Sequence, residues 1–556
     1  MSLGPELIEA VSREIVASFC RNRLRRAESG DKWLALSFPG ERVIFFSWDA
    51  ENYGLCLAHA DEIRAMSELA SSRPPLQSAV KSHAVGAELT GAAALGRDRV
   101  LEITFRREVG AGFCQTKKLV FEASGRYSNL ALLDESGTVI ESAKHIHPET
   151  NRYRSVIPGQ PYAPPPPIAG VPPEDFACGP ERLDGVSGIG KPLIAAIKEI
   201  CQASGEHDAG KVLRRMSGEP PLYQMLGQYV TLFPEPLAGA TRLDAGSALA
   251  AARECVILPL MARHTAKARK AAASRIGRLA SSNAKKIAEA EAAQSDASAA
   301  DAFKRDGQAI LANIGRIPPR ASSADLPEWG TDGETIRRVE LDPDRDAQGN
   351  AERCFAKYRK KRASAERSRA ILPRLYSERD VIREQEALLA CHSDALTIKS
   401  MMGELSPDEA QPKGKKQKER LKPPHRRLEF AEESAVMLIG LSAAGNHYVT
   451  FRLADSDDTW FHAQGTPGAH VILRFASKPD PKTYDRMIEI AASAAAFYSK
   501  AKESGRVRVD YALRKYVRAI PGAGPAQVTY KDFSSIVADT SSWQRCSSSD
   551  AGLKSV

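Results

Sequence analysis

The stretch from Arg97 to Pro167 constrains the fold of this chain more than any other, because apolar and polar residues alternate along it in short runs. Alternation with a period of two is typical of a strand with one buried face. The runs lie at 101–105, 119–122, 129–133 and 138–141. Between the last two runs, Asp134 to Gly137 has the composition of a turn. The stretch therefore predicts an antiparallel β-meander.

The ends of these predicted strands are polar and basic. Arg and Asn side chains at such positions can donate hydrogen bonds to the phosphates or base edges of a nucleic acid. The polar residues at the strand ends are Asp98, Arg99, Arg126, Asn129, Arg152 and Arg154. The alternative is that these side chains only cap the sheet and face solvent.

The composition narrows the class of protein. The 556 residues include 78 Lys and Arg against 69 Asp and Glu, and the net charge of +9 favours a polyanionic partner. The nine cysteines form no Cys-x-x-Cys pair, which favours reduced thiols over a disulfide framework or a zinc site. The first 26 residues lack the apolar core of a signal peptide, and no window is apolar enough to span a membrane. We therefore expect a cytoplasmic protein of about three or four domains, without a membrane partner.

Residues 1–170 are predicted to form one α+β domain around the meander. Helices are expected at 5–26 and 71–88. Strands are expected at 33–38 and 43–48, and their large aromatic residues are expected in the core: Trp33, Phe45 and Trp48. The proline run at 164–167 can continue neither a helix nor a sheet, so it marks the end of the domain.

Residues 171–237 have a different pattern. Gly188-Ile189-Gly190 precedes an apolar helical run and resembles the turn of a helix-hairpin-helix domain. In such a turn, backbone N–H groups at a helix N-terminus can hold a phosphate. A tight turn that only joins two packed helices would have the same sequence, and this alternative stays open.

Residues 238–405 are rich in Ala, Arg, Lys and Glu, which predicts a long antiparallel coiled-coil arm with its tip near 302–345. Pro373 is expected to kink or interrupt the second helix. Basic residues cluster on both helices and favour RNA, although a solvated helix face is the alternative. The clusters are Arg263, Lys267, Arg269 and Lys270, and Lys357, Arg359, Lys360, Lys361 and Arg362.

Residues 406–428 form a basic linker that includes Lys413, Lys415 and Lys416. Between 412 and 427 there are eight Lys and Arg against one Glu. A flexible cationic tract of this kind is a sequence-blind tether for RNA, or else a solubilising spacer.

Residues 429–540 are predicted to form a second compact α+β domain that binds RNA. Strands are expected at 437–440 and 448–451 around a turn at 444–446, then a helix at 488–502 and a basic strand at 510–517. Aromatic, imidazole and cationic side chains beside these strands could stack on bases and contact phosphates. The residues expected to do so are Asn446, Trp460, His462, His470 and Lys515.

Two alternatives apply to that domain. Trp460 could belong to the core instead of the surface. Asp458, His462 and His470 could suggest a metal site, but their spacing matches no familiar metal motif, so no metal is expected. Residues 541–556 are expected to form a disordered tail.

Several motifs resemble the NFACT family, in the family's own order. In the first domain they are DRVLEITF from Asp98, GRYSNLALLDESGTVIESAKHI from Gly125 and NRYRSVIPGQPYAPPPP from Asn151. Further along they are LDPDRDAQGNAERCFAKYRKKRASAE from Leu341, DTWFHAQGTPGAH from Asp458 and VDYALRKYV from Val509. The resemblance implies an NFACT-N domain at 1–170, a helix-hairpin-helix domain, a coiled-coil middle domain and an NFACT-R RNA-binding domain at 429–540.

The resemblance also implies a function in ribosome-associated quality control. The family binds large ribosomal subunits that carry a stalled peptidyl-tRNA, and its bacterial members recruit alanyl-tRNA and direct an untemplated C-terminal alanine tail. The implied partners are large-subunit rRNA, tRNA-Ala, the stalled nascent peptidyl-tRNA and a small accessory RNA-binding protein. The ribosome forms the peptide bond, so the protein would position tRNA instead of acting as an enzyme, with no catalytic residue and no cofactor.

Three residues are assigned to tRNA through the resemblance. Asp98 and Arg99 match the family's Asp-Arg pair, and Glu122 matches the start of a tRNA-contacting segment. Ala123 and Ser124 depart from the larger aliphatic residue and Met found there in the family. They are expected at the exposed end of the sheet, where they would relax the selection of tRNA.

Two other functions are considered. A β-rich domain followed by a helix-hairpin-helix also resembles formamidopyrimidine-type DNA glycosylases, whose nucleophile is an N-terminal proline. Here Pro5 is internal, and its amide nitrogen has no nucleophilic lone pair. A surface adhesin that binds fibronectin is the other alternative, and the basic tracts disfavour it.

Overall fold

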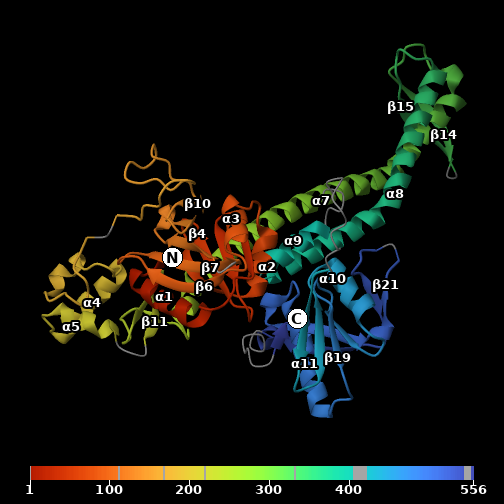
Figure 1. Ribbon diagram of the computed structural model, residues 1–556. Helices are drawn as coiled ribbons and strands as arrows, with labels where there is room; N and C mark the ends of the chain where they lie inside the picture. Colours follow the sequence, from red (N-terminus) through yellow and green to blue (C-terminus); the bar gives the residue numbers. More distant parts are fainter. Residues whose placement is uncertain are drawn as a thin grey trace. The chain divides into compact units, whose positions relative to one another are not determined.

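The computed structural model describes residues 2–110, 113–166, 169–217, 221–330, 333–392, 394–404, 423–521, 523–543 and 553–555. The chain is a mixed α+β protein with several sheets, and it divides into two compact units (Figure 1). The first comprises Met1–Ala266 with Asp394–Leu396, and the second comprises Lys267–Ser393 with Thr397–Val556.

The predicted meander is confirmed as a five-stranded antiparallel sheet in the order β10-β9-β8-β7-β6. The predicted strands are β7 (Val100–Gly110), β8 (Phe113–Glu122), β9 (Asn129–Leu133) and β10 (Val139–Ser142). The edge strand β6 (Glu88–Ala94) was not predicted. In the register, Val100 pairs with Glu122 and Glu122 pairs with Asn129, so the polar strand ends meet at one end of the sheet.

A second sheet packs with three helices in the same core. Its strands are β2 (Arg26–Gly30), β3 (Trp33–Ser37), β4 (Val43–Trp48) and β5 (Tyr53–Ala58), and the helices are α1 (Pro5–Phe19), α2 (Ala60–Leu69) and α3 (Pro75–His83). The three aromatic residues predicted in the core, Trp33, Phe45 and Trp48, are buried. The helix predicted to reach residue 26 ends at Phe19, because Arg21 takes a left-handed backbone conformation with φ 67° and its N–H binds Leu89 O.

Residues 171–242 contribute helices α4 (Lys191–Ser204) and α5 (Ala209–Arg214) and a small sheet in the order β1-β12-β11-β13. The strands are β1 (Ser2–Leu3), β11 (Leu222–Leu226), β12 (Tyr229–Phe233) and β13 (Thr241–Arg242). At the Gly188-Ile189-Gly190 turn, the Gly190 N–H donates to the Glu6 carboxylate at 3.2 Å. Tyr229 and Thr231 hydroxyls donate to the same carboxylate, so this N–H group already has a partner inside the protein.

Two long helices and a hairpin start the second unit. The helices are α7 (Ile257–Ala312) and α8 (Ala347–Cys391), and the hairpin between them is β14 (Ser323–Gly330) with β15 (Gly333–Glu340). The two helices run side by side (Figure 1) and meet where Asn283 Nδ2 donates to Leu375 O at 3.1 Å. Pro373 was expected to kink or interrupt the second helix; an interruption is excluded because α8 continues through it, and a kink stays a prediction.

The rest of this unit is a seven-stranded sheet in the order β23-β20-β18-β19-β17-β16-β24, with α11 (Pro481–Phe497) on one face. Its strands are β16 (His425–Phe430), β17 (Ala435–Gly440), β18 (Thr459–Ala463), β19 (Val471–Phe475), β20 (Arg506–Leu513), β23 (Ser534–Asp539) and β24 (Leu553–Ser555). Three shorter elements complete the unit: α9 (Ala395–Glu404), β21 (Val517–Ala519) and β22 (Val528–Tyr530).

Two predictions for this region are wrong. The strand expected at 448–451 is helical, because the Ser442 hydroxyl accepts from Gly445 N and starts α10 (Ala443–Tyr448), which a π-helical turn extends. The expectation of a disordered tail from residue 541 is wrong for residues 541–543, because Trp543 is buried and its N–H donates to Ser493 Oγ at 2.8 Å. In the part of the chain that the structure describes, no helix combines the length and apolar character needed to cross a membrane.

Candidate nucleic-acid interface

The seven residues predicted to bind tRNA all lie at or near one end of the five-stranded sheet. We call them the strand-end cluster: Asp98, Arg99, Glu122, Arg126, Asn129, Arg152 and Arg154. Asp98 and Arg99 precede β7, Glu122 ends β8 and Asn129 starts β9. The remaining arginines lie on the loops that follow β8 and β10.

Glu122 and Arg154 face inward and form a buried ion pair. Arg154 Nη1 and Nη2 donate to the two Glu122 oxygens at 2.7 and 2.5 Å, and their side chains are 9% and 2% exposed. Tyr162 Oη donates to the same carboxylate at 2.7 Å. The Glu122 hydrogen bonds raise the pKa of Arg154, and burial raises the pKa of Tyr162. The prediction that these two residues face a tRNA is corrected, because each is the other's partner.

Asn129 also faces inward and joins two loops. It is buried, its Nδ2 donates to Lys144 O at 2.9 Å, and its Oδ1 accepts from Lys144 N at 2.8 Å. The Lys144 ammonium in turn donates to Arg126 O at 3.0 Å. Asn129 therefore holds the loops after β8 and β10 together, and its predicted contact with RNA is corrected to a positioning role.

Three arginines of the cluster have no carboxylate partner among the described residues: Arg99, Arg126 and Arg152. Arg126 and Arg152 are exposed, and Arg99 is half-buried. Arg99 Nη1 makes only long contacts with Tyr53 Oη (3.4 Å) and Leu3 O (3.5 Å), and its buried Nε has no hydrogen-bond partner. Asp98 accepts from the Arg99 N–H at 2.7 Å and fixes the start of β7. These three cations remain available for phosphates.

The expected exposure of Ala123 is wrong, because its side chain is fully buried. Its N–H donates to Arg99 O at 2.8 Å, which continues the β7–β8 pairing by one residue and turns the side chain into the core. Ser124 is half-buried. A tRNA therefore has no access to Ala123.

Two exposed tyrosines of this end of the sheet were not predicted. Tyr127 is 64% exposed and Tyr153 is 91% exposed. Each follows an exposed arginine of the cluster, Arg126 or Arg152. Adjacent Arg and Tyr in a loop is the sequence signal that could have identified them.

The ring residues predicted to bind RNA in the C-terminal sheet are mostly inside it. Trp460 and His470 are buried with ring centroids 5.2 Å apart, and His462, half-buried, stacks on Trp460 at 5.8 Å. With Tyr530, whose ring lies 4.9 Å from Trp460, they form what we call the ring cluster. Burial lowers the pKa of His462 to about 4 and that of His470 well below its usual value.

The RNA contact predicted for Asn446 is corrected in the same way, whereas that of the exposed Lys515 stays a prediction. Asn446 is buried, accepts from His470 N at 2.9 Å and donates to Gly468 O at 3.0 Å and to the Glu384 carboxylate. Lys515 lies on the surface but pairs with Asp457 at 3.2 Å. The stacking platform expected from Trp460, His470 and Asn446 is therefore a core with an internal hydrogen-bond network.

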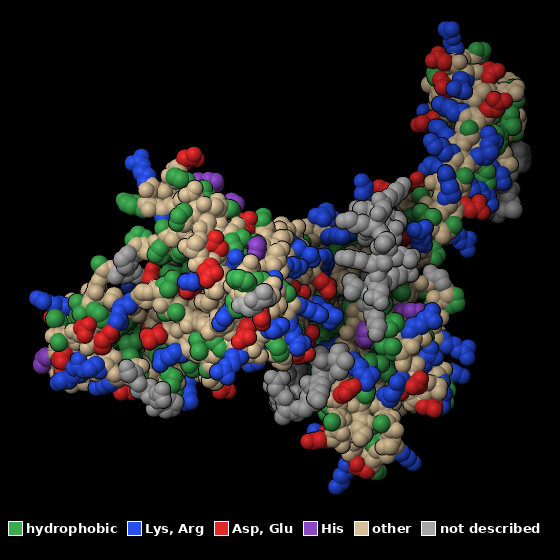
Figure 2. All heavy atoms as spheres, viewed as in Figure 1, with side chains coloured by type: hydrophobic (Ala, Val, Ile, Leu, Met, Phe, Trp, Pro, Cys, Tyr) green, Lys and Arg blue, Asp and Glu red, His purple; other side chains and the backbone are tan. Residues whose placement is uncertain are grey.

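Lys and Arg side chains gather along α7 and α8 (Figure 2). Two of the predicted basic residues form ion pairs within the protein: Arg263 with Asp49, and Lys361 with Asp296. Four predicted cations are exposed and have no ion pair among the described residues: Lys267, Lys270, Arg359 and Lys360. The linker residues Lys413, Lys415 and Lys416 lie outside the described residues.

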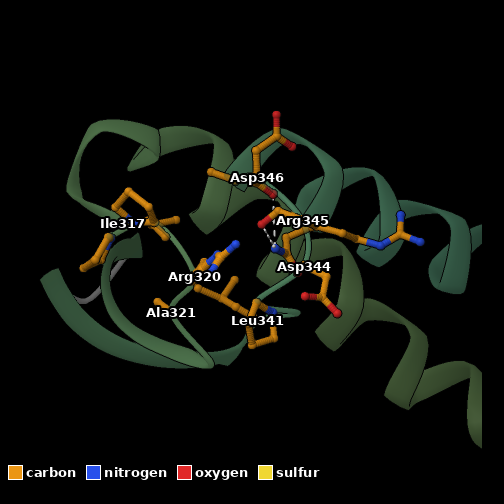
Figure 3. A pocket seen from close by; sticks show the side chains of 12 residues that line it. Ile317, Arg320, Ala321, Leu341, Asp344, Arg345 and Asp346 are labelled. Carbon is orange, nitrogen blue, oxygen red and sulfur yellow. Dashed lines mark hydrogen bonds between the residues drawn. The ribbon is translucent and has the colours of Figure 1, made fainter.

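A cavity of about 380 Å³ lies beside the start of α8 (Figure 3). Ile317, Leu341 and prolines form its apolar part. Arg320 and Arg345 lie at the cavity with Asp344 and Asp346, so the charges balance, and Asp346 is already used as the cap that accepts from Gly349 N. The lining therefore does not select one class of ligand. No group of His, Cys, Asp and Glu in the described ranges could hold a metal ion.

A family model described as "NFACT N-terminal and middle domains" matches residues 8–185 and 260–423, which is more than half of the chain. The chain belongs to the NFACT family. The family assignment agrees with the motifs at Asp98, Gly125, Asn151 and Leu341, all of which lie within the matched ranges.

Curated relatives of this NFACT protein match most of its length. It is 28% identical over 505 residues to the "Rqc2 homolog RqcH" of Bacillus subtilis (strain 168), covering 83% of this chain and 84% of the relative. It is 24% identical to the protein of the same name from Streptococcus suis (strain 05ZYH33), covering 79% and 80%. Among solved structures, the C-terminal part of the fibronectin/fibrinogen-binding protein from Streptococcus suis matches at 22% identity and a TM-score of 0.35, covering 50% of this chain and 95% of that chain. At this TM-score the likeness supports no conclusion.

Proposed function

We propose that this NFACT protein is a ribosome-associated quality control factor. It binds the large ribosomal subunit that carries a stalled peptidyl-tRNA, recruits alanyl-tRNA and directs untemplated alanine tailing of the nascent chain. Family membership and the relatives named RqcH support the assignment to this process. The single observation that carries tRNA binding is the set of three arginines without carboxylate partners at the strand-end cluster: Arg99, Arg126 and Arg152.

The protein acts by positioning and not by catalysis. The peptide bond is formed by the ribosome, so the protein has to hold the incoming tRNA and lower the entropic cost of its arrival. A surface of fixed arginines suits this role, since phosphate contacts set position and orientation without reading sequence. The partners are large-subunit rRNA, tRNA-Ala and the stalled peptidyl-tRNA, with a small accessory RNA-binding protein, and the location is the cytoplasm.

The finer architecture is part of the proposal. The NFACT-N domain has a glycosylase-like organisation with the helix-hairpin-helix domain after it, and α7 with α8 is a coiled-coil arm. The pairing of Asn283 with Leu375 O and the shared cluster of Ile287, Ala290, Leu372 and Leu375 support the arm. Its exposed cations contact rRNA electrostatically, together with the linker.

Sedimentation and RNA recovery test the proposal together. We expect the protein to sediment with the large subunit, to dissociate as salt rises, and to yield tRNA and large-subunit rRNA after crosslinking in cells. Asp98→Ala with Arg99→Ala should abolish tRNA recovery and tailing while the protein stays folded. Arg64→Ala, an exposed arginine of α2, is the matched control and should behave as the unmodified protein. Salt-insensitive sedimentation, or tailing by the double variant, contradicts the proposal.

A further inference from the structure

The loop that carries Arg152 and Tyr153 is closed and internally braced. An isolated bridge closes it, with Ile146 N donating to Val156 O at 3.0 Å and Val156 N to Ile146 O at 2.9 Å. Val156 is buried in the core. Inside the loop, Thr150 N and Asn151 N both donate to His147 O, at 2.9 and 3.0 Å. The loop therefore has a defined path between its two anchored ends.

Arg154 fixes the orientation of its neighbour Tyr153. The Arg154 guanidinium is held inside by Glu122 and also donates to Ala163 O at 3.1 Å. Tyr153 N donates to Asn151 Oδ1 at 2.9 Å, so the backbone on the other side of the ring is held as well. Between these two fixed points, the Tyr153 side chain is 91% exposed. A large aromatic ring is thus fixed at its backbone and left in solvent.

Tyr127 is presented in a similar way on the loop after β8. The Lys144 ammonium donates to Arg126 O, the carbonyl group next to Tyr127, at 3.0 Å. The Arg126 guanidinium lies 4.8 Å from the centre of the Tyr127 ring, and its Nη2 donates to Tyr127 Oη at 2.7 Å. The Arg126 contact occupies part of the ring, and the side chain is still 64% exposed. The pair offers a cation and a ring together.

We propose that Tyr127 and Tyr153 are base-stacking residues of the tRNA site, and that the buried Glu122–Arg154 pair is the clamp that presents Tyr153. The proposal rests on the proposed function, because it names how the same site holds its tRNA. Exposed rings beside unpaired arginines suit a single-stranded loop, whose unstacked bases can lie on aromatic faces while its phosphates meet cations. A partner protein would bury such rings against apolar side chains, and here the neighbours Arg126, Arg152, His145 and His147 are polar and exposed.

Affinity for a tRNA-Ala transcript, measured by filter binding at several salt concentrations, tests this. Loss of one stacked base costs about 5- to 150-fold in Kd, so we expect Tyr153→Ala to weaken binding by that factor and Tyr153→Phe to leave it within about two-fold. The slope of log Kd against log salt should stay unchanged in Tyr153→Ala, because no phosphate contact is removed. Arg152→Ala should remove one phosphate contact and therefore reduce the magnitude of that slope by about one. Tyr127→Ala should act as Tyr153→Ala does.

The variants separate the possible failures. If the unmodified protein binds no tRNA, the proposed function itself fails. If it binds, and Tyr127→Ala and Tyr153→Ala bind equally well, the stacking role is overturned and the proposed function stands. If Tyr153→Phe weakens binding as much as Tyr153→Ala does, the tyrosine acts through a hydrogen bond of its hydroxyl and not through stacking. That result also overturns the stacking role. Because both rings are exposed, unfolding curves of all variants should overlay that of the unmodified protein.

Discussion

The strand-end cluster with its two tyrosines and the ring cluster with its neighbour Lys515 both combine rings and charged side chains, yet these are divided between surface and core in opposite ways. At the strand ends, the carboxylate pair is inside, and the rings of Tyr127 and Tyr153 are outside. In the C-terminal sheet, the rings of Trp460 and His470 are inside, and the charged Lys515 is outside. Both regions attracted the same RNA-binding interpretation from sequence. The structure leaves Arg99, Arg126 and Arg152 without carboxylate partners among the described residues of the first region, and it buries Trp460 and His470 in the second, so RNA binding stays a prediction for the first.

The difference follows from where each ring lies, within a central strand or on a loop. Trp460 lies within β18, where neighbouring strands and α10 with its π-helical extension cover the ring on the face opposite α11. Tyr153 lies on the loop after β10, and among the described residues its side chain is left 91% exposed. An aromatic residue within a central strand is therefore a core residue first, whereas one on a braced loop is available for contact. Variants at each position can test whether its side chain stabilises the core or contacts RNA.

The largest expected effect is on stability, at Trp460. Trp460→Ala removes a fully buried ring and should lower the free energy of unfolding by about 3–5 kcal/mol. Denaturant unfolding measures this, and Tyr153→Ala, which should change stability by less than about 0.5 kcal/mol, is the matched aromatic control. A stable Trp460→Ala protein that has lost RNA binding would break the comparison and restore the surface role of Trp460.

Glu122 comes next. Glu122→Ala leaves the Arg154 charge buried without its partner, which should cost about 3–5 kcal/mol, close to the value expected for Trp460. Replacing both residues with Met removes the unpaired charge, so Glu122→Met with Arg154→Met should recover most of the stability. If Glu122→Ala unfolds as the unmodified protein does but binds tRNA poorly, the ion pair does not stabilise the fold, and Glu122 acts at the tRNA site, either by direct contact or by presenting Tyr153.

The next effect concerns whether Ala123 belongs to the core or to the surface. Because its side chain is buried, Ala123→Leu adds volume to a filled core and should destabilise the protein by about 1–3 kcal/mol. Ser124→Met, at a half-buried site, should cost less. Thermal unfolding compares the two variants. A stable Ala123→Leu protein with altered tails on a stalled reporter would mean that the core around Ala123 opens when tRNA binds.

The smallest effect concerns pH and the ring cluster. Burial lowers the pKa of His470 well below 6.5. Below about pH 6.5, the imidazole is therefore protonated in the unfolded chain and still neutral in the folded protein. Stability should therefore fall as pH drops below about 6.5, by up to about 1.4 kcal/mol per pH unit from this residue. The titratable groups that act on His470 are His447 and His462, and Asp510 acts on His462. His470→Gln, unfolded in denaturant at pH 7.5 and 5.5, should lose that part of the pH dependence, and an unchanged dependence would contradict the assignment.

The sequence predicted the regular elements well and the direction of side chains poorly. Alternation located β7, because a strand with one buried face repeats every two residues, and short apolar runs beside turns located β4 and β9, which are buried along their whole length. It could not tell Arg152 from Arg154, which lie two apart in one motif. Arg154 turns inward because Glu122, 32 residues earlier, accepts its hydrogen bonds. In the same way, the apolar run at 448–451 looked like a strand until the cap at Ser442 was known.

The carboxylate of Glu6 at the Gly190 N–H group has a consequence for any nucleic acid that approaches this turn. A phosphate that sought the same N–H group would compete with an acceptor attached to the same chain, and a tethered competitor acts at a high effective concentration. The competitor is also supported by Tyr229 and Thr231, whose hydroxyls would lose their acceptor if it left. The bound Glu6 carboxylate therefore links the start of α1 to the start of α4, and a phosphate would have to break this link to reach the Gly190 N–H group.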